Sequence, residues 1–172
     1  MINTKLSCRY WSGEQPDVFQ ERVVKSQGVN VFIAVTSERV YGPYYFDRNI
    51  DHAAYIELLD QQLLPDLLAT GVRLDEMYFQ QDGAPAHRHG ASLHFLRQHF
   101  GNNLISLNTN FEWPPRSPDL TPLDYFVWGV VKYQVYQKPT RTLPELRQRI
   151  EDAVRTINAE VKLKLNGIYS VY

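Results

Sequence analysis

The clearest strand pattern in the chain spans residues 29–36, VNVFIAVT. Its odd positions are all branched apolar residues, and its even positions include a Phe and an Ala, which predicts a strand covered on both faces. Two further runs, 6–11 (LSCRYW) and 40–46 (VYGPYYF), are also strand-like. The three runs together predict an antiparallel meander in which Pro43 confines its own strand to an edge.

Helical and strand patterns alternate in the next part of the chain. Apolar residues at helical spacing begin after Asp51 and stop at Gly71, and Pro65 is expected to kink or restart that helix. Short apolar runs at 77–81 (MYFQQ) and 104–107 (LISL) predict buried strands. This order predicts an α/β fold, a mixed sheet of antiparallel and parallel strands with helices on both faces.

Three more helices are expected toward the C-terminus. One is predicted over 85–99, since a proline suits its first position, and another over 118–136. A last helix is predicted to begin after Thr142 as N-cap, with a glutamate at capping-box distance and one apolar stripe. No pattern divides the chain, so we assign a single domain to 1–158 and a C-terminal tail to 159–172.

Composition narrows the classes of protein to consider. The 172 residues carry a net charge of −1, which argues against a self-sufficient nucleic-acid binder with a strongly basic surface. The single cysteine, Cys8, excludes an internal disulfide framework and suits a reducing compartment. No apolar run is long enough to span a membrane, and residues 1–15 lack a secretory signal. We expect a soluble intracellular chain with no membrane partner.

A first candidate carboxylate follows the predicted strand 77–81. Asp82 and Gly83 end this strand, and the carboxyl ends of strands are where α/β sheets gather ligands and metals. The alternative is that Asp82 only shapes the turn into the next helix, because Asp-Gly is a common turn pair.

A second candidate carboxylate lies in the stretch 113–128, WPPRSPDLTPLDYFVW. Asp119 directly follows a Ser-Pro helix start and is expected to cap that helix. Asp124 lies inside the helix among apolar residues, where an unpaired buried carboxylate would be costly. Either its helix face is wet or it meets a cation.

Asp82 and Asp124 would converge if this helix packs beside the strand, and we then expect them within about 8 Å of each other. Two carboxylates suit Mg²⁺ or Mn²⁺. Two such ions, about 3.5–4 Å apart, can activate water and stabilise the leaving oxygen in phosphodiester cleavage.

Two motifs carry a family resemblance. The segments QDGAPAH at 81–87 and WPPRSPDLTPLDYFVWG at 113–129 closely resemble the DDE/DDD transposases of the mariner-like superfamily. The resemblance implies an RNase H-like fold in which Asp82 is the second catalytic carboxylate and Asp124 the third. It also implies Mg²⁺-dependent cutting and joining of DNA (transposon ends and target DNA), nuclear localisation, and pairing as a homodimer or with a full-length transposase subunit. His87 would lie beside the active site.

The chain departs from this family at its N-terminus. The first catalytic Asp of the family lies on a strand upstream of the segment resembling LSCRYW, yet residues 1–16 contain no Asp. The helix-turn-helix DNA-binding region is not matched either. We therefore expect a truncated catalytic domain with weakened metal binding, inactive alone. Without that central strand, two sheet edges should be exposed, one of them near Asp82.

Several alternatives stay open. His87 could contact phosphate or orient a carboxylate, or it could be a helix-start histidine open to solvent. The histidine-rich stretch 87–99 has no pair at i,i+4, which disfavours zinc. Trp113, Trp128 and the tyrosines are expected in the core rather than on a base-stacking surface. Competing functions are a non-enzymatic remnant that binds nucleic acid or pairs with a transposase subunit, and another RNase H-like nuclease.

Overall fold

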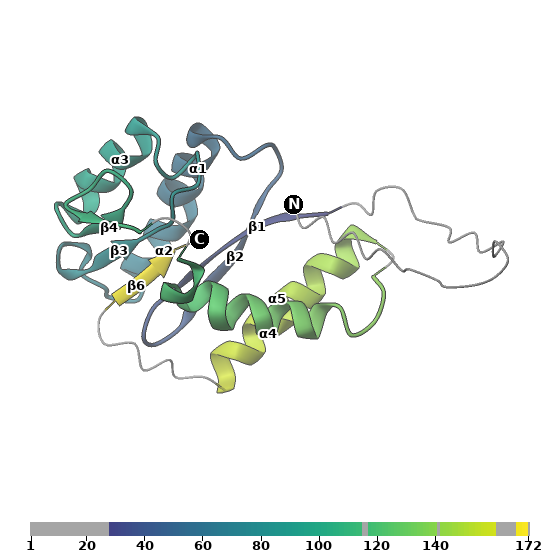
Figure 1. Cartoon of the computed structure of the whole chain (residues 1–172). Coiled ribbons are helices and arrows are strands. Elements are labelled where there is room, and N and C mark those ends of the chain that lie inside the picture. Colours follow the sequence, from purple (N-terminus) through teal and green to yellow (C-terminus); the bar gives the residue numbers. More distant parts are fainter. Residues whose placement is uncertain (1–27, 115–116, 141, 161–167, 172) are drawn as a thin grey trace, which may run out of the picture.

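A six-stranded mixed sheet is the centre of the computed structural model (Figure 1), which describes residues 28–114, 117–140, 142–160 and 168–171. Strand β1 is antiparallel to β2 and β6, whereas β6, β3, β4 and β5 run parallel. The order across the sheet is β2 (Val40–Phe46), β1 (Asn30–Val35), β6 (Ile168–Val171), β3 (Tyr78–Gln80), β4 (Leu104–Ser106) and β5 (Phe111–Glu112). The mixed α/β architecture that the sequence predicts is therefore confirmed, and it is compatible with an RNase H-like fold.

Helices cover both faces of the sheet (Figure 1). The helices of one face are α1 (His52–Leu58), the π-helical turn η1 (Leu59–Leu63), α2 (Leu64–Ala69) and α3 (Gly90–Phe100), with the short 3₁₀ turn η2 (Leu74–Glu76) leading into β3. The helices of the other face are the π-helical turn η4 (Leu123–Val127), α4 (Trp128–Val135) and α5 (Leu143–Glu160), and the 3₁₀ turn η3 (Pro118–Leu120) precedes η4.

Strand β1 divides the core into these two layers. Phe32 and Ala34 are buried among the helices of the first face, and Ile33 and Val35 are buried among those of the second. The prediction of a strand covered on both sides is confirmed. Strand β2, which contains Pro43, forms one edge of the sheet, as the proline predicts.

The helical run after Asp51 also agrees with its prediction. The Asp51 carboxylate accepts the N–H of Ala54 at 2.8 Å and caps α1, and Gly71 ends the run with a φ of 78°. Just before Pro65 the helix widens into η1. A proline cannot donate a helical hydrogen bond and crowds the carbonyl four residues back, and the wider turn accommodates it.

The last helix begins as its pattern predicts. The hydroxyl of Thr142 accepts the N–H of Glu145 at 3.3 Å, so Thr142 is the N-cap of α5. The predicted apolar stripe faces the second core layer through Leu146, Ile150 and Val154. None of the helices in the described part of the chain is both long and apolar enough to cross a membrane.

Two helix predictions need correction. The helix expected from Pro85 begins only at Gly90, because the side chain of Asp82 bonds to the backbone of Ala84 and holds the intervening residues in turns. The helix expected over 118–136 is divided into η3, η4 and α4. In the loop before it lies β5, a two-residue strand that no pattern in the sequence predicts.

The expectation of exposed sheet edges beside β1 and β3 is wrong for the described residues. Strand β6, from the segment assigned to the tail, lies between them. Ser170 is the register partner of Val35 in β1 and of Gln80 in β3. The predicted strand 6–11, with Cys8, lies outside the described residues.

Candidate functional site

A buried glutamine fixes the backbone where β3 ends. Gln81 is fully buried, and its side-chain oxygen accepts the hydroxyl hydrogen of Tyr55 at 2.7 Å. Its amide nitrogen donates to the carbonyl of His87 and to the hydroxyl of Ser106, both at 3.0 Å. Gln81 thus joins α1, β4 and the loop after β3. This role was not predicted from the sequence, where its signal is a polar residue directly after a short, mostly apolar strand.

Asp82 follows immediately and is held by two contacts to the same oxygen. Its Oδ1 accepts the N–H of Ala84 at 2.9 Å and lies 2.6 Å from Nδ1 of His87. The bond to Ala84 shows that Asp82 does shape the turn, as one of the two readings of the Asp-Gly pair expected. The side chain nevertheless keeps 33% of its surface exposed. It is therefore both anchored and accessible.

The contacts of Asp82 also determine its charge. Burial raises the pKa of the carboxyl, but the hydrogen bonds from His87 and Ala84 and the electrostatic attraction of His87 outweigh burial. The net result is a pKa below the ordinary value of 3.8. Asp82 is consequently an anion at neutral pH.

His87 is buried, so the alternative of a solvent-open histidine at a helix start is wrong. Its ring lies 4.6 Å from the ring of Tyr55, centroid to centroid. Because ionised Asp82 can only accept, Nδ1 of His87 is the donor in their contact. Burial and the charge of Asp82 raise the pKa of Tyr55 well above its ordinary value, so its hydroxyl stays protonated and able to donate to Gln81.

Asp124 is presented on an exposed surface by two buried neighbours. Leu123 and Val127 are fully buried in the second core layer, and the hydroxyl of Thr121 accepts the N–H of Leu123 at 3.3 Å. Asp124 itself is exposed on η4. The helix face that carries Asp124 is therefore open to solvent, which leaves a meeting with a cation as a prediction. Asp119 is also exposed, within η3.

One contact relates the two candidate carboxylates. The side-chain amide of Gln80, the last residue of β3, donates to the carbonyl of Leu120 at 3.5 Å. Asp82 lies two residues beyond Gln80, and Asp124 lies four residues beyond Leu120. The structure thus joins Asp82 to His87 directly and connects the segment of Asp124 to the carboxyl end of β3. No group of three His, Cys, Asp or Glu side chains suited to a metal occurs among the described residues.

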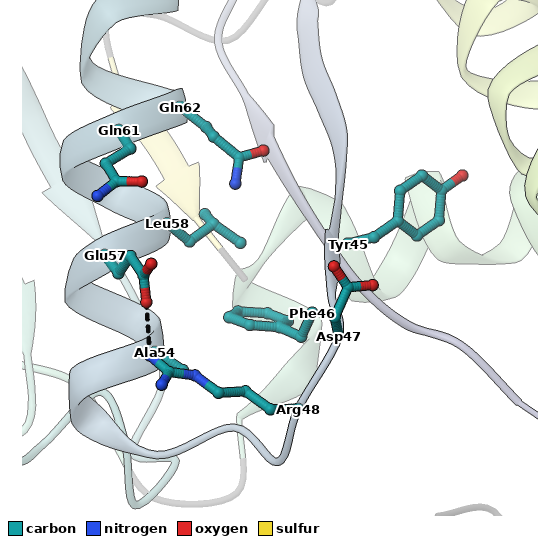
Figure 2. Close-up of a pocket in the computed structure, with 9 residues that line it drawn as sticks. All are labelled: Tyr45, Phe46, Asp47, Arg48, Ala54, Glu57, Leu58, Gln61 and Gln62. Carbon is teal, nitrogen blue, oxygen red and sulfur yellow. Dashed lines mark hydrogen bonds and ion pairs between the residues drawn. The ribbon is translucent and has the colours of Figure 1, made fainter.

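A separate pocket of about 350 Å³ lies between α1, η1 and the end of β2 (Figure 2). Phe46 and Leu58 line it together with the ion pair of Arg48 and Glu57, and Figure 2 shows Phe46 directed toward the helix. None of the predicted site residues lines this pocket. The candidate site is therefore the open carboxyl end of β3 rather than this pocket.

The fold is compatible with the RNase H-like class that the resemblance implies. A scan against protein-family models found no match. The chain is 29% identical over 155 residues to the Transposable element Tc3 transposase of Caenorhabditis elegans. The matched region covers 87% of this chain and 44% of that protein. The chain is thus related to transposases of the Tc1/mariner type, and it spans less than half the length of this relative.

Proposed function

We propose that this chain is the metal-dependent DNA cleavage and strand-transfer domain of a transposase, acting in transposition and integration of a transposable element. Asp82 and Asp124 would be its catalytic and metal-binding carboxylates. The substrates would be transposon ends and target DNA, and the site of action the nucleus. Support comes from the related Tc3 transposase and from the two motifs that contain these residues.

The observation that carries the proposal is the state of Asp82. It is ionised, one third exposed, and oriented through a single oxygen by His87 and Ala84. Because both contacts use Oδ1, Oδ2 has no hydrogen-bond partner among the described residues and would be available to a cation. A carboxylate held only to shape a turn would not need a buried histidine against the same oxygen.

The donor set fits a hard divalent cation. Asp82 and Asp124 supply carboxylate oxygens, the ligands that Mg²⁺ and Mn²⁺ prefer, and exposed Asp124 leaves room for water and phosphate oxygens. When bound, the metal would polarise the scissile phosphate and its attacking oxygen. His87 would hold Asp82 in its ionised form and direction, and would not itself move a proton in the reaction.

We further propose that the 172-residue chain by itself is inactive, because only two of the three carboxylates implied by the resemblance match its residues. It would then act with a second copy or with a full-length transposase subunit. The alternative is a non-enzymatic remnant that binds nucleic acid or pairs with such a subunit. Metal binding at Asp82 and Asp124 separates these two functions, because the remnant has no need of it.

Nicking of supercoiled plasmid in Mg²⁺ or Mn²⁺ tests the activity, with Asp82→Asn as the matched variant. We expect that the purified chain alone shows no nicking that depends on Asp82. Nicking by the wild type that Asp82→Asn removes would contradict the proposed inactivity while supporting the assignment of the site. Nicking that persists in the variant would point to contamination or to a different site, and would remove Asp82 from the mechanism.

A further inference from the structure

We propose that the exposed side of the helix bearing Asp124 binds a short stretch of unpaired DNA beside the candidate cleavage site. The choice of DNA rests on the proposed function above. The evidence is an aromatic stripe, defined here as Tyr125, Tyr133 and Tyr136, and a glycine, Gly129, that interrupts it.

The three tyrosines of the aromatic stripe are among the most exposed large side chains of the described residues. Tyr125 is 59%, Tyr133 72% and Tyr136 70% exposed. The expectation that the tyrosines belong to the core is wrong for these three, whereas Trp113 is buried and Trp128 packs against the second core layer as expected. Exposed aromatic side chains that gather on one surface mark interaction sites.

The stripe lies opposite the buried side of its helix. Residues four apart, from Leu123 through Val127 and Val131 to Val135, are all buried in the second core layer. Tyr125 lies on η4, Tyr133 on α4 and Tyr136 at the C-cap of α4, and all three are exposed while this row is buried. The core of the fold therefore makes no use of the tyrosine rings.

Gly129 has no explanation within the fold. A glycine inside a helix is destabilising relative to alanine. Beyond its own helix backbone, a Cβ added at Gly129 would meet no atom of the described residues within 4 Å, and its φ is not in the positive region that favours glycine. It lies midway between Tyr125 and Tyr133 in sequence, so it leaves bare backbone between two exposed rings. Such a gap admits a flat group close to the helix.

Unpaired bases are the ligand that fits this combination. Every base offers an aromatic face for stacking on a side chain, and a duplex hides those faces. Lys132, exposed between Gly129 and Tyr136, would contact a phosphate. With Asp124 at one end and Lys138 at the other, the segment is too weakly basic to follow a duplex backbone by charge alone.

The length of the aromatic stripe limits how many nucleotides it can bind. From Tyr125 to Tyr136 the helix extends by roughly 16 Å, which matches about five nucleotides at the stacked spacing of roughly 3.4 Å. Tyr125 is also the next residue after Asp124. The end of the stripe at Tyr125 therefore lies on the same turn, η4, as the candidate carboxylate.

Fluorescence anisotropy with a short labelled oligothymidine, in EDTA and at low salt, tests the proposal. The wild-type chain should bind this strand more tightly than a duplex of equal length. The triple change Tyr125→Ala, Tyr133→Ala, Tyr136→Ala should weaken binding roughly tenfold or more, whereas the corresponding triple change to Phe, which keeps the rings, should retain it. Leu68→Ala, a similarly exposed position (57%) on the other face of the sheet, should leave affinity unchanged.

Gly129 gives a second, opposite readout. Gly129→Ala should raise the Tm, because alanine favours the helix, and Gly129→Leu should fold yet lower the affinity for oligothymidine by filling the gap. A structural role for Gly129 would instead lower the Tm in both variants, and that result would overturn its part in the site.

Other outcomes also decide the matter. Failure of the wild type to bind the single strand, or equal binding by the triple Ala variant, would overturn the proposal. Conversion of a dimer to a monomer by the Ala variant, with DNA affinity unchanged, would make the stripe a protein interface instead. Because EDTA removes divalent ions, this binding test fails or succeeds independently of metal-dependent cleavage.

Discussion

The two candidate carboxylates are presented in opposite ways. Asp82 directly follows Gln81, whose side chain makes three hydrogen bonds. The Oδ1 of Asp82 is in turn held by His87 and Ala84. Asp124 is exposed on a π-helical turn that is anchored through apolar burial of Leu123. The described contacts hold Asp82 through a polar network, and they anchor the turn that bears Asp124 through the packing of Leu123. Different substitutions should therefore disturb each of them.

The largest loss of stability is expected at η4, the turn that bears Asp124. Leu123→Ala removes a fully buried side chain from beneath Asp124 and should lower the free energy of unfolding by about 2–5 kcal/mol. Chemical denaturation measures this loss. Leu120→Ala, at a half-exposed position in η3, is the matched control and should cost far less. Equal losses at the two positions would mean that η4 is not anchored by its apolar face.

The hydrogen-bond network next to Asp82 should lose stability when Gln81 is replaced. Gln81→Met keeps the volume but leaves the partners of three buried hydrogen bonds unsatisfied, so we expect a loss of about 2–3 kcal/mol in unfolding free energy. Gln98→Met on the exposed side of α3 is the control. NMR chemical shifts should change around His87 and not around Asp124. Shifts spreading to Asp124 would show that the two carboxylates are not positioned independently.

His87 should control the ionisation of Asp82. In His87→Leu the favourable hydrogen bond is lost while burial remains, so the pKa of Asp82 should rise. Carboxyl ¹³C NMR titration measures it, with exposed His94→Leu as control. Because the folded-state pKa is below 3.8, the stability contributed by Asp82 is fully present above pH 3.8 and lost as the pH falls through the folded value. An unchanged pKa in His87→Leu would remove His87 as the orienting group.

The smallest effect is expected at the cap of α5. Thr142→Ala removes the acceptor for the N–H of Glu145 and should cost about 1 kcal/mol. Hydrogen exchange should speed up only in the first turn of α5, with the loop of Asp82 unaffected. Thr156→Ala, inside the same helix, is the comparison. Faster exchange around Asp82 in Thr142→Ala would contradict the separation of the two regions.

Sequence reasoning reached the parts of this molecule that local patterns determine. Strand β1 and the cap at Thr142 follow from periodicity and capping chemistry. The late start of α3 does not follow from local patterns. The side chain of Asp82 accepts the backbone N–H of Ala84, and the helix predicted from Pro85 therefore begins only at Gly90. Strand β6 has strand-forming residues, Ile168–Val171, but so short a run does not show its pairing with two distant strands.

The candidate site was predictable to a similar extent. Asp82, Asp124 and His87 could be selected from motifs and spacing. The Gln81 network and the burial of His87 could not, because both depend on contacts between segments far apart in the chain, such as that between Gln81 and Tyr55. The exposure of Tyr125 was also missed, since the sequence alone does not show which side of η4 packs against the core.

The central claim is that Asp82 and Asp124 share one cation site, and paramagnetic broadening by Mn²⁺ tests it most directly. In a ¹⁵N NMR spectrum of the whole chain, the amide signals of Gly83 and Tyr125 should broaden at the same low Mn²⁺ concentration. Either Asp82→Asn or Asp124→Asn should abolish the broadening of both signals. Broadening of only one signal, or loss at Gly83 alone in Asp82→Asn, would show that the carboxylates act separately and would contradict the account.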